Sequence, residues 1–298
     1  MNICVLLSTY NGERYLEEQL ESLVRQKNVN ISILVRDDGS TDQTCEILSK
    51  WQNKGLLTWY SGDNKGFAMS FMDLLFHSGD YDYYALCDQD DIWLPDKLET
   101  AIKHLSVIQH PIKLYCSDAF YYKNGVNYGL IKKYIPKFNI YTCLVQNIAA
   151  GCTMVFSHGL RNLIITKMPS FIIAHDFWIY QVAVILGEVY YDANSYILYR
   201  QHDNNQIGAK TGICEKWKRR IFRLIKSSKK DSRSLQAKEL LKCYFDEMDS
   251  EKKKIVYRIA EYKKNIWTRS RLFFDGRYTM GRLMNNVLMR MRIVLGKL

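Results

Sequence analysis

The chain has 298 residues, of which 47% are hydrophobic and 13% aromatic, so it holds enough apolar side chains for a sizeable core and is not a disordered polymer. No apolar stretch approaches the roughly 20 residues that span a bilayer, and the first residues lack the basic region and cleavage site of a signal peptide. Eight cysteines without a CxxC pair predict reduced thiols in a cytosolic protein, and argue against a zinc site or a disulfide framework.

The net charge of +11 is unevenly distributed along the chain. Residues 215–298 contain 24 Lys and Arg against 9 Asp and Glu, whereas residues 1–214 contain 18 against 22. The basic character therefore belongs to the C-terminal region. It predicts an anionic partner, which on this observation alone is a membrane surface, a nucleic acid or another protein.

Strands and helices are predicted to alternate from the N-terminus to about residue 110, as in a mostly parallel α/β sheet. The predicted strands, in chain order, are 3–8, the first part of 31–51, 56–61 and 83–88. Ser40 or Thr41 can cap the helix that follows the second strand. The predicted helices are 13–26, the last part of 31–51, 67–78 and 96–108.

Four polar turns follow these strands: "STYN", "DDGS", "DNKG" and "DQDD". Ligands of such sheets bind beyond the carboxyl ends of the strands, so all four turns are expected to open onto one crevice. The pattern becomes mixed from about residue 112 to 212, and is helical and basic beyond 213. We therefore predict an α/β catalytic domain at 1–212 and a basic helical region at 213–298.

The "DQDD" turn places three carboxylates within four positions. If the strand stays extended, Asp88 and Asp90 face the same side and Asp91 turns away. Two such oxygen donors suit Mg²⁺ or Mn²⁺, which take one or two carboxylates together with substrate phosphates. The alternative is that these aspartates form a turn and cap the next helix.

Three other stretches offer candidate groups. The acidic turn 36–42 suits ribose hydroxyls or base N–H groups, or is a plain Asp-Gly turn before a helix. Asp176 in "AHDFW" is a candidate general base, or a helix-terminal carboxylate stabilised by the helix dipole. "YRQHDNNQIG" supplies Arg200 and His202. A lone histidine is usually structural, but the carboxylates of the "DQDD" turn make a role near a metal the alternative.

Together these stretches resemble the family 2 glycosyltransferases, which have the nucleotide-sugar-binding GT-A fold. The matching segments occur in the expected order over residues 1–210: "LLSTYNGERYLEEQLESLVRQ", "ILVRDDGSTDQT", "DNKGFAMSF", "CDQDDIWLPDKLE", "NIAAGCTMVFS", "HDFW" and "YRQHDNNQIG". The forms "DQDDIW", "HDxW" and "YRQHxxN" are most similar to the rhamnosyltransferase-like subgroup that builds bacterial surface polysaccharides such as O-antigen and capsule.

The resemblance implies an inverting, metal-dependent transfer of one sugar from a nucleotide donor. The nucleotide-binding residues it implies are Thr9, Tyr10, Asn11, Glu13, Asp38, Lys65 and Asp88. Asp90 would hold Mg²⁺ or Mn²⁺, His202 would be a further metal ligand or a diphosphate contact, and Asp176 matches the general base. The residues expected near the donor sugar or the acceptor are Asp91, Gly151, Cys152, His175, Trp178 and Arg200. Among these, Asp91 is expected to be mainly structural.

Two departures from the family pattern bear on the identity of the general base and on the number of sugars transferred. The usual acidic pair is His175–Asp176 here, so only Asp176 can be the carboxylate base. The Gln/Arg-rich motif of processive synthases is absent, which predicts transfer of a single residue. The resemblance favours dTDP-rhamnose as the donor, with UDP-hexoses as the alternative.

The basic C-terminal region includes amphipathic segments at 216–226 and 281–298. We expect them to contact anionic lipid at the inner face of the plasma membrane, where a lipid-linked acceptor is reached. The alternative is packing on the catalytic domain. A sugar-phosphate nucleotidyltransferase is disfavoured because "STYNGERY" lacks a Gly-rich basic loop. A nucleic-acid-binding protein is disfavoured because the crevice motifs lie in the net acidic part, so no nucleic-acid partner is expected.

Overall fold

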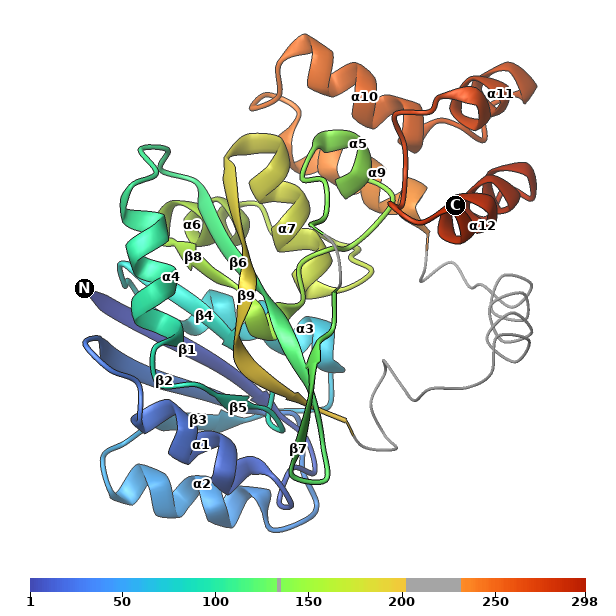
Figure 1. Cartoon of the computed structure of the whole chain (residues 1–298). Coiled ribbons are helices and arrows are strands. Elements are labelled where there is room, and N and C mark those ends of the chain that lie inside the picture. The colour runs from blue at the N-terminus through green and yellow to red at the C-terminus, as the bar shows by residue number, and fades with distance from the viewer. Residues whose placement is uncertain (133–134, 202–231) are drawn as a thin grey trace. The chain divides into compact units, whose positions relative to one another are not determined.

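The structure is a computed structural model of the whole chain, and it describes residues 1–132, 135–201 and 232–298. It divides into two compact units (Figure 1). The first consists of residues 1–135, 149–166 and 187–202, and the second of residues 136–148, 167–186 and 203–298. The predicted domain boundary at 212/213 falls outside the described residues and stays a prediction.

The first unit is built on a mixed β-sheet covered by α-helices. Its strands, within the described ranges, are β1 (Asn2–Thr9), β2 (Asn30–Asp37), β3 (Thr58–Ser61), β4 (Tyr83–Cys87), β5 (Ile92–Trp93), β6 (Lys113–Lys123), β7 (Val126–Leu130), β8 (Val155–Ser157) and β9 (Glu188–Arg200). Its helices there are α1 (Leu16–Val24), α2 (Thr44–Asn53), α3 (Phe67–His77), α4 (Lys97–Ser106) and α6 (His158–Thr166), with a short 3₁₀ turn, η1 (Gly151–Thr153). The predicted alternation of strands and helices up to about residue 110 is confirmed.

The strand order among the described residues is β3-β2-β1-β4-β8-β6-β9-β5, with β7 beside β6. The first four strands are parallel, β8 runs antiparallel to both of its neighbours, and β6 and β9 are again parallel. Parallel pairing places the carboxyl ends of β1, β2 and β4 at one edge. The polar turns that follow them therefore meet there, as the sequence predicted.

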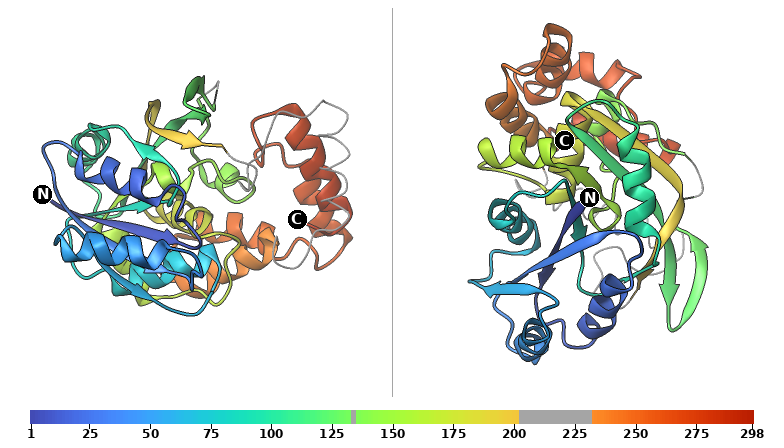
Figure 2. Two further views of the ribbon diagram at one scale, coloured as in Figure 1. Left: turned by 90° about the horizontal axis from the view of Figure 1, so that it is seen from below. Right: turned by 90° about the vertical axis from the view of Figure 1, so that its left-hand side faces the viewer.

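Alternation along the strands divides the core of this unit between the two faces of the sheet. Odd-numbered residues of β1, such as Val5 and Leu7, share one cluster with Leu20 of α1 and Leu98 of α4. On the opposite face Arg161 of α6 bonds the carbonyl of Leu75 at the end of α3. Figure 2 shows α3 and α4 on opposite sides of the sheet. Helices thus cover both faces of the sheet, which leaves the strand ends as the expected place for a ligand.

The second unit is helical in its described parts. Its helices there are α5 (Ile140–Cys143), α7 (His175–Leu186), α9 (Arg233–Tyr244), α10 (Ser250–Ala260), α11 (Ile266–Phe274) and α12 (Leu283–Val294). Helix α7 is apolar and buried on every side, which is typical of a helix inside a core. None of the described helices is both long and apolar enough to cross a membrane.

Candidate active site

The loops after β1 and β2 are joined through Asn11. Its backbone N–H donates to Ser40 Oγ at 2.8 Å, and its side-chain oxygen accepts from the Thr41 N–H at 2.8 Å. Asn11 adopts a positive φ of 47°, a conformation that asparagine tolerates better than most residues. Glu13 makes a similar link, since its carboxylate accepts from the Gln43 N–H at 2.9 Å. Both predicted nucleotide-binding residues therefore also fix the loops at the carboxyl ends of β1 and β2.

Gln89 joins the loop after β1 to the turn after β4. Its Oε1 accepts from Thr9 Oγ1 at 2.6 Å and from the Tyr10 N–H at 2.8 Å, and its Nε2 donates to the Tyr10 carbonyl at 3.2 Å. Thr9 is buried by this contact, whereas the Tyr10 ring remains exposed. A Cβ on Gly12 would lie 2.5 Å from Gln89 Oε1, so a larger residue there would displace the Gln89 side chain from these hydrogen bonds. Sequence reasoning missed Gln89, although it lies inside the "DQDD" motif.

Asp38 lies in the loop after β2, where the sequence placed it, and is fully buried. Its carboxylate pairs with the buried Arg36 guanidinium and accepts from the N–H groups of Lys65 and Gly66, both at 2.9 Å. The Lys65 ammonium is paired with Asp73 at 2.6 Å. Asp38 thus ties the start of α3 to the end of β2, and the nucleotide-contacting roles of Asp38 and Lys65 stay predictions.

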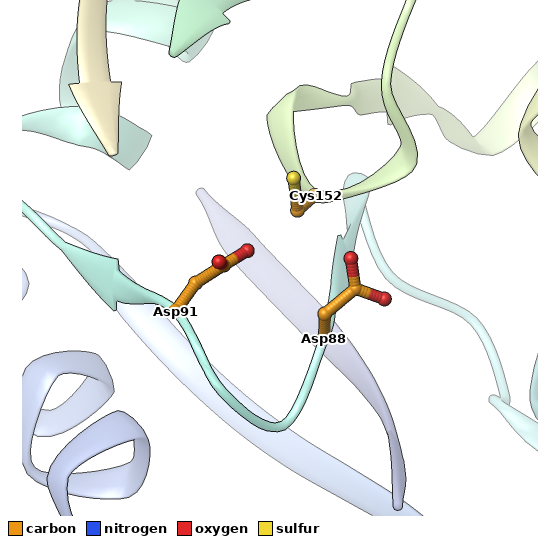
Figure 3. A group of neighbouring side chains, drawn as sticks. All are labelled: Asp88, Asp91 and Cys152. Atoms are coloured by element: carbon orange, nitrogen blue, oxygen red, sulfur yellow. The ribbon is translucent and has the colours of Figure 1, made fainter. Parts of the chain in front are cut away.

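The turn after β4 brings two carboxylates and a thiol together. Asp88, Asp91 and Cys152 each offer a ligand atom, and these atoms lie within 4.8 Å of one another. Figure 3 shows the three side chains as neighbours, Asp88 and Asp91 on the turn after β4 and Cys152 on η1. Strand β4 ends at Cys87, so residues 88–91 form a turn in which the two-residue alternation of a strand no longer applies. Asp91, rather than turning away, faces Asp88.

Asp91 is buried, and its environment disfavours a lone negative charge. Burial is the largest effect raising the pKa of its carboxyl well above the usual range, and the neighbouring Asp90 and Asp88 add to it. Oδ1 accepts from the Arg200 N–H at 3.1 Å, but Oδ2 has no hydrogen-bond partner within the described parts of the chain. An unpartnered carboxylate oxygen beside a second carboxylate is a donor set that fits a divalent cation.

Arg200, at the end of β9, holds this turn in place. Besides the backbone bond to Asp91, its Nε donates to the Asp90 carbonyl at 2.8 Å. Its guanidinium further contacts the Tyr15 ring at 4.8 Å, the Tyr122 ring at 5.3 Å and the Glu18 carboxylate. Arg200 was predicted near the sugar or the acceptor; these contacts give it a part in shaping the acidic turn.

A buried lysine lies close to the same cluster. The Lys97 ammonium is 3.3 Å from the centre of the Trp93 ring and has no hydrogen-bond acceptor within the described residues. Burial lowers its pKa to about 8, although the neighbouring Cys87, Cys152 and Asp91 favour its charged form. In the sequence Lys97 looked like an ordinary residue of the first turn of a helix, and no local signal set it apart.

The other predicted site residues lie in or near α7 in the second unit. Asp176 is in the first turn of α7, and its carboxylate accepts a hydrogen bond from the N–H of the next residue, Phe177, at 2.7 Å. His175 is buried, which lowers its pKa to about 4. The Trp178 indole is fully buried, with its ring centre 5.9 Å from that of Tyr244. His202 lies outside the described residues.

Polar contacts from α9 hold the segment that leads into α7. The buried Gln236 accepts from the Ile173 N–H at 2.6 Å and donates to Gln181 Oε1 of α7 at 2.6 Å. One turn later, Glu239 accepts from the N–H and hydroxyl of Ser170 at 2.7 and 2.9 Å. The C-terminal region therefore contributes directly to the position of the α7 N-terminus.

An α/β sheet with polar turns meeting at the strand ends, and an acidic cluster in one of them, is typical of enzymes that bind a phosphate-containing ligand together with a divalent cation. The sequence profile "Glycosyl transferase family 2" matches residues 4–164. The dTDP-rhamnosyl transferase RfbG of Shigella flexneri is 32% identical over 232 residues, covering 72% of this chain and 77% of that protein. The chain belongs to glycosyltransferase family 2, and it is a glycosyltransferase that uses a nucleotide-sugar donor.

Solved structures agree with this fold. Residues 1–349 of TarS from S. aureus, in complex with UDP-GlcNAc, superpose with a TM-score of 0.57 at 16% identity, covering 99% of this chain and 82% of that one. The mannosyltransferase PcManGT from Pyrobaculum calidifontis, in complex with GDP-Man and Mn²⁺, gives a TM-score of 0.54 at 15% identity, covering 99% and 80%. The predicted GT-A-like α/β fold is confirmed.

Proposed function

We propose that this enzyme transfers one rhamnosyl residue from dTDP-rhamnose to a hydroxyl of a growing bacterial surface glycan, with inversion and with the help of Mg²⁺ or Mn²⁺. The observation that carries the metal dependence is the meeting of Asp88, Asp91 and Cys152 at the carboxyl end of β4. The 32% identity to a dTDP-rhamnosyl transferase supports the donor. A UDP-hexose donor is the alternative.

Asp88 and Asp91 would hold the cation, with the Cys152 thiol beside them. When bound, the cation supplies positive charge that stabilises the departing nucleoside diphosphate. Burial raises the pKa of the Cys152 thiol well above its usual range, and its soft sulfur is a poorer ligand for Mg²⁺ or Mn²⁺ than a carboxylate oxygen. The resemblance also assigns Asp90 and His202 to the metal, and Asp90 lies in the same turn.

The edge of the crevice would receive the nucleotide. Tyr10 is exposed beside the buried Thr9, and both are fixed by Gln89. Asn11 and Glu13 hold the loops after β1 and β2 together, so donor binding meets a preformed edge. A preformed site loses less conformational entropy on binding, which favours affinity.

Asp176 is proposed as the general base. Its carboxylate would accept the proton of the acceptor hydroxyl while that oxygen bonds to the anomeric carbon and the bond from that carbon to the diphosphate oxygen breaks. Attack opposite the leaving group inverts the anomeric centre. A position in the first turn of α7 stabilises the carboxylate anion, since the helix dipole is positive at this end.

The acceptor is proposed to be lipid-linked, and the enzyme to work at the inner membrane face through its basic C-terminal helices. The charge distribution of the chain supports this, since the whole excess of Lys and Arg lies in residues 215–298. Transfer of a single residue, without processive polymerisation, completes the proposal.

A donor panel tests the proposed function. The full chain is incubated with dTDP-rhamnose, UDP-glucose, UDP-galactose and UDP-GlcNAc in Mn²⁺ or EDTA, and release of nucleoside diphosphate is measured. We expect dTDP-rhamnose to be hydrolysed fastest, and EDTA to abolish the reaction. Preference for a UDP-hexose would refute the rhamnosyl assignment, and full activity in EDTA would refute the metal.

Two variants test the base with the preferred donor and an acceptor extract. Asp176→Asn should lower transfer by about 10²- to 10⁴-fold, the usual contribution of a general base, while Mn²⁺ affinity stays unchanged. Asp246→Asn, an exposed aspartate of the same unit, is the matched control. Transfer at the wild-type rate by Asp176→Asn would show that Asp176 is not the base.

A further inference from the structure

Helices α11 and α12 expose an unusual amount of apolar surface. On α11, Trp267 and Phe274 are 78% and 80% exposed, and Leu283 at the start of α12 is 82% exposed. Single exposed apolar residues are normal on soluble proteins, but a contiguous group marks an interaction site. The other large apolar side chains exposed in this segment are Ile266, Met284, Val287, Met291, Val294 and Leu295.

The spacing of these residues forms stripes along both helices. On α12, Met284, Val287, Met291 and Val294 recur at intervals of three and four residues, which places them on one face. Met289 and Ile293 are buried and lie on the opposite face. Helix α12 therefore has one apolar face inside its unit and a second apolar face on the surface, which packing within the unit does not explain.

The two helices lie side by side in Figures 1 and 2 and are joined by arginines. Arg290 of α12 donates to the carbonyl of Leu272 in α11 at 2.7 Å and to that of Asp275 at 2.9 Å. Arg269 of α11 donates to the Val294 carbonyl at 3.3 Å. These bonds hold α11 and α12 together as one hairpin, which carries the exposed apolar residues of both helices.

The charge of this segment selects the partner. Residues 262–298 contain nine Lys and Arg and one acidic residue, Asp275. That single carboxylate is paired with Arg258 and Arg277, and its hydrogen bond with Arg277 is the main cause of its low pKa, about 2. Apolar stripes, an exposed tryptophan and a nearly pure positive charge together match the interface of an anionic bilayer, where rings and aliphatic side chains enter the headgroup region.

We infer that the exposed stripes of α11 and α12 are a docking surface for bilayers containing anionic phospholipid. The inference rests on the proposed function, which places the basic C-terminal helices at the inner membrane face near a lipid-linked acceptor, and it names the residues that would contact the lipid. The same compact unit carries α7 with Asp176, so lipid contact would hold the unit that contains the proposed base at the membrane.

Vesicle flotation of the full chain tests this surface. Binding to vesicles that mix phosphatidylcholine and phosphatidylglycerol in a ratio of about two to one is compared with binding to pure phosphatidylcholine, in low salt and in high salt. We expect strong binding only to the anionic vesicles, weakened by salt but not abolished, since the apolar contacts persist. Equal binding to both vesicle types, or none to either, would overturn the inference.

Substitutions locate the surface. The triple variant Trp267→Ser, Phe274→Ser, Leu283→Ser should lower the bound fraction at least tenfold. The matched control, Phe76→Ser with Val107→Ser, removes two exposed apolar side chains from the first unit and should bind like wild type. A triple variant that keeps wild-type vesicle binding would refute the assignment. So would the finding that the wild type is a dimer, that the triple variant is a monomer, and that neither protein binds vesicles.

Donor hydrolysis in the absence of vesicles separates this inference from the proposed function. The triple variant should hydrolyse the donor at the wild-type rate and unfold at the wild-type temperature. If the wild type hydrolyses no nucleotide sugar yet binds anionic vesicles through these residues, the proposed function fails and the docking surface stands. If donor hydrolysis is normal but the triple variant binds vesicles like wild type, the docking surface fails and the proposed function stands.

Discussion

Replacing Arg200 by alanine removes the side chain that fixes the turn of Asp90 and Asp91. The variant loses the 2.8 Å bond from Nε to the Asp90 carbonyl and the guanidinium contacts with Tyr15 and Tyr122. A net hydrogen bond contributes about 1 kcal/mol and each cation–π contact about 0.5–1 kcal/mol. The ion pair with the half-exposed Glu18 adds little, because solvent screens it.

These contributions predict a loss of about 2–3 kcal/mol in the free energy of unfolding, measured by urea denaturation. The backbone bond from Arg200 to Asp91 remains available to alanine, so the turn is loosened rather than lost. We therefore expect Mn²⁺ affinity, measured by calorimetry, to fall about tenfold, and kcat for donor hydrolysis to fall with it.

Two comparisons make the test specific. Glu18→Gln removes only the solvent-exposed partner and should change stability by less than about 1 kcal/mol, with wild-type Mn²⁺ affinity. Arg200→Lys keeps the charge but not the planar group, and should resemble the alanine variant in Mn²⁺ affinity. If Arg200→Ala is destabilised yet binds Mn²⁺ like wild type, Arg200 supports the fold alone and the reasoning is refuted.

Three further predictions concern other parts of the chain. Gly12→Ala should displace Gln89, lower the free energy of unfolding by about 1–3 kcal/mol and lower the rate of donor hydrolysis. Gly276→Ala, where an added Cβ meets open space, should change neither the urea denaturation curve nor the hydrolysis rate. Gln236→Leu leaves the partly buried Ile173 N–H and the buried Gln181 Oε1 without their partner, and should lower the free energy of unfolding in urea by about 2–4 kcal/mol; a neutral variant would mean that these bonds do not hold α7. Since the pKa of His175 is about 4 in the folded chain and near 6.5 unfolded, the unfolded chain binds the extra proton, so about 3 kcal/mol of stability should be lost as pH falls from 6.5 to 4. His175→Gln should flatten that part of the stability curve, and an unchanged slope would assign it to other groups.

The alternation of strands and helices made the fold predictable from the sequence. Apolar runs such as "ICVLLS" and "YYALC" are short, bounded by polar turns and separated by helical patterns, so β1 and β4 could be placed. Parallel pairing then predicts that their turns meet at one edge. Local pattern and global fold agree over this part of the chain.

The geometry of the acidic turn could not be predicted in the same way. The sequence suggested an extended strand through Asp90, but β4 ends at Cys87 and the turn rotates Asp91 toward Asp88. Cys152 completes the group from a 3₁₀ turn that lies far along the chain, beyond β6 and β7. No sequence periodicity records where a strand stops pairing or which distant turn approaches it.

The contacts of α9 were equally hidden. Gln236 and Gln181 lie far apart in the sequence, and a glutamine in a basic helical segment carries no signal that it is buried. The excess of Lys and Arg marked residues 215–298 as basic, but it did not show that α9 forms one compact unit with α7. Long-range polar contacts of this kind follow from tertiary packing, not from local composition.

The proposed metal site at the end of β4 depends on Asp91 and Asp88. Calorimetric titration of Mn²⁺ into the Asp91→Asn variant, in the presence of nucleoside diphosphate, tests this site most directly. Asp96→Asn is the control, an aspartate outside the cluster, and Asp90→Asn tests the metal ligand that the family resemblance implies. We expect Asp91→Asn to weaken Mn²⁺ binding at least tenfold and Asp96→Asn to bind Mn²⁺ like wild type. Wild-type Mn²⁺ affinity in Asp91→Asn would show that Asp91 does not hold the ion.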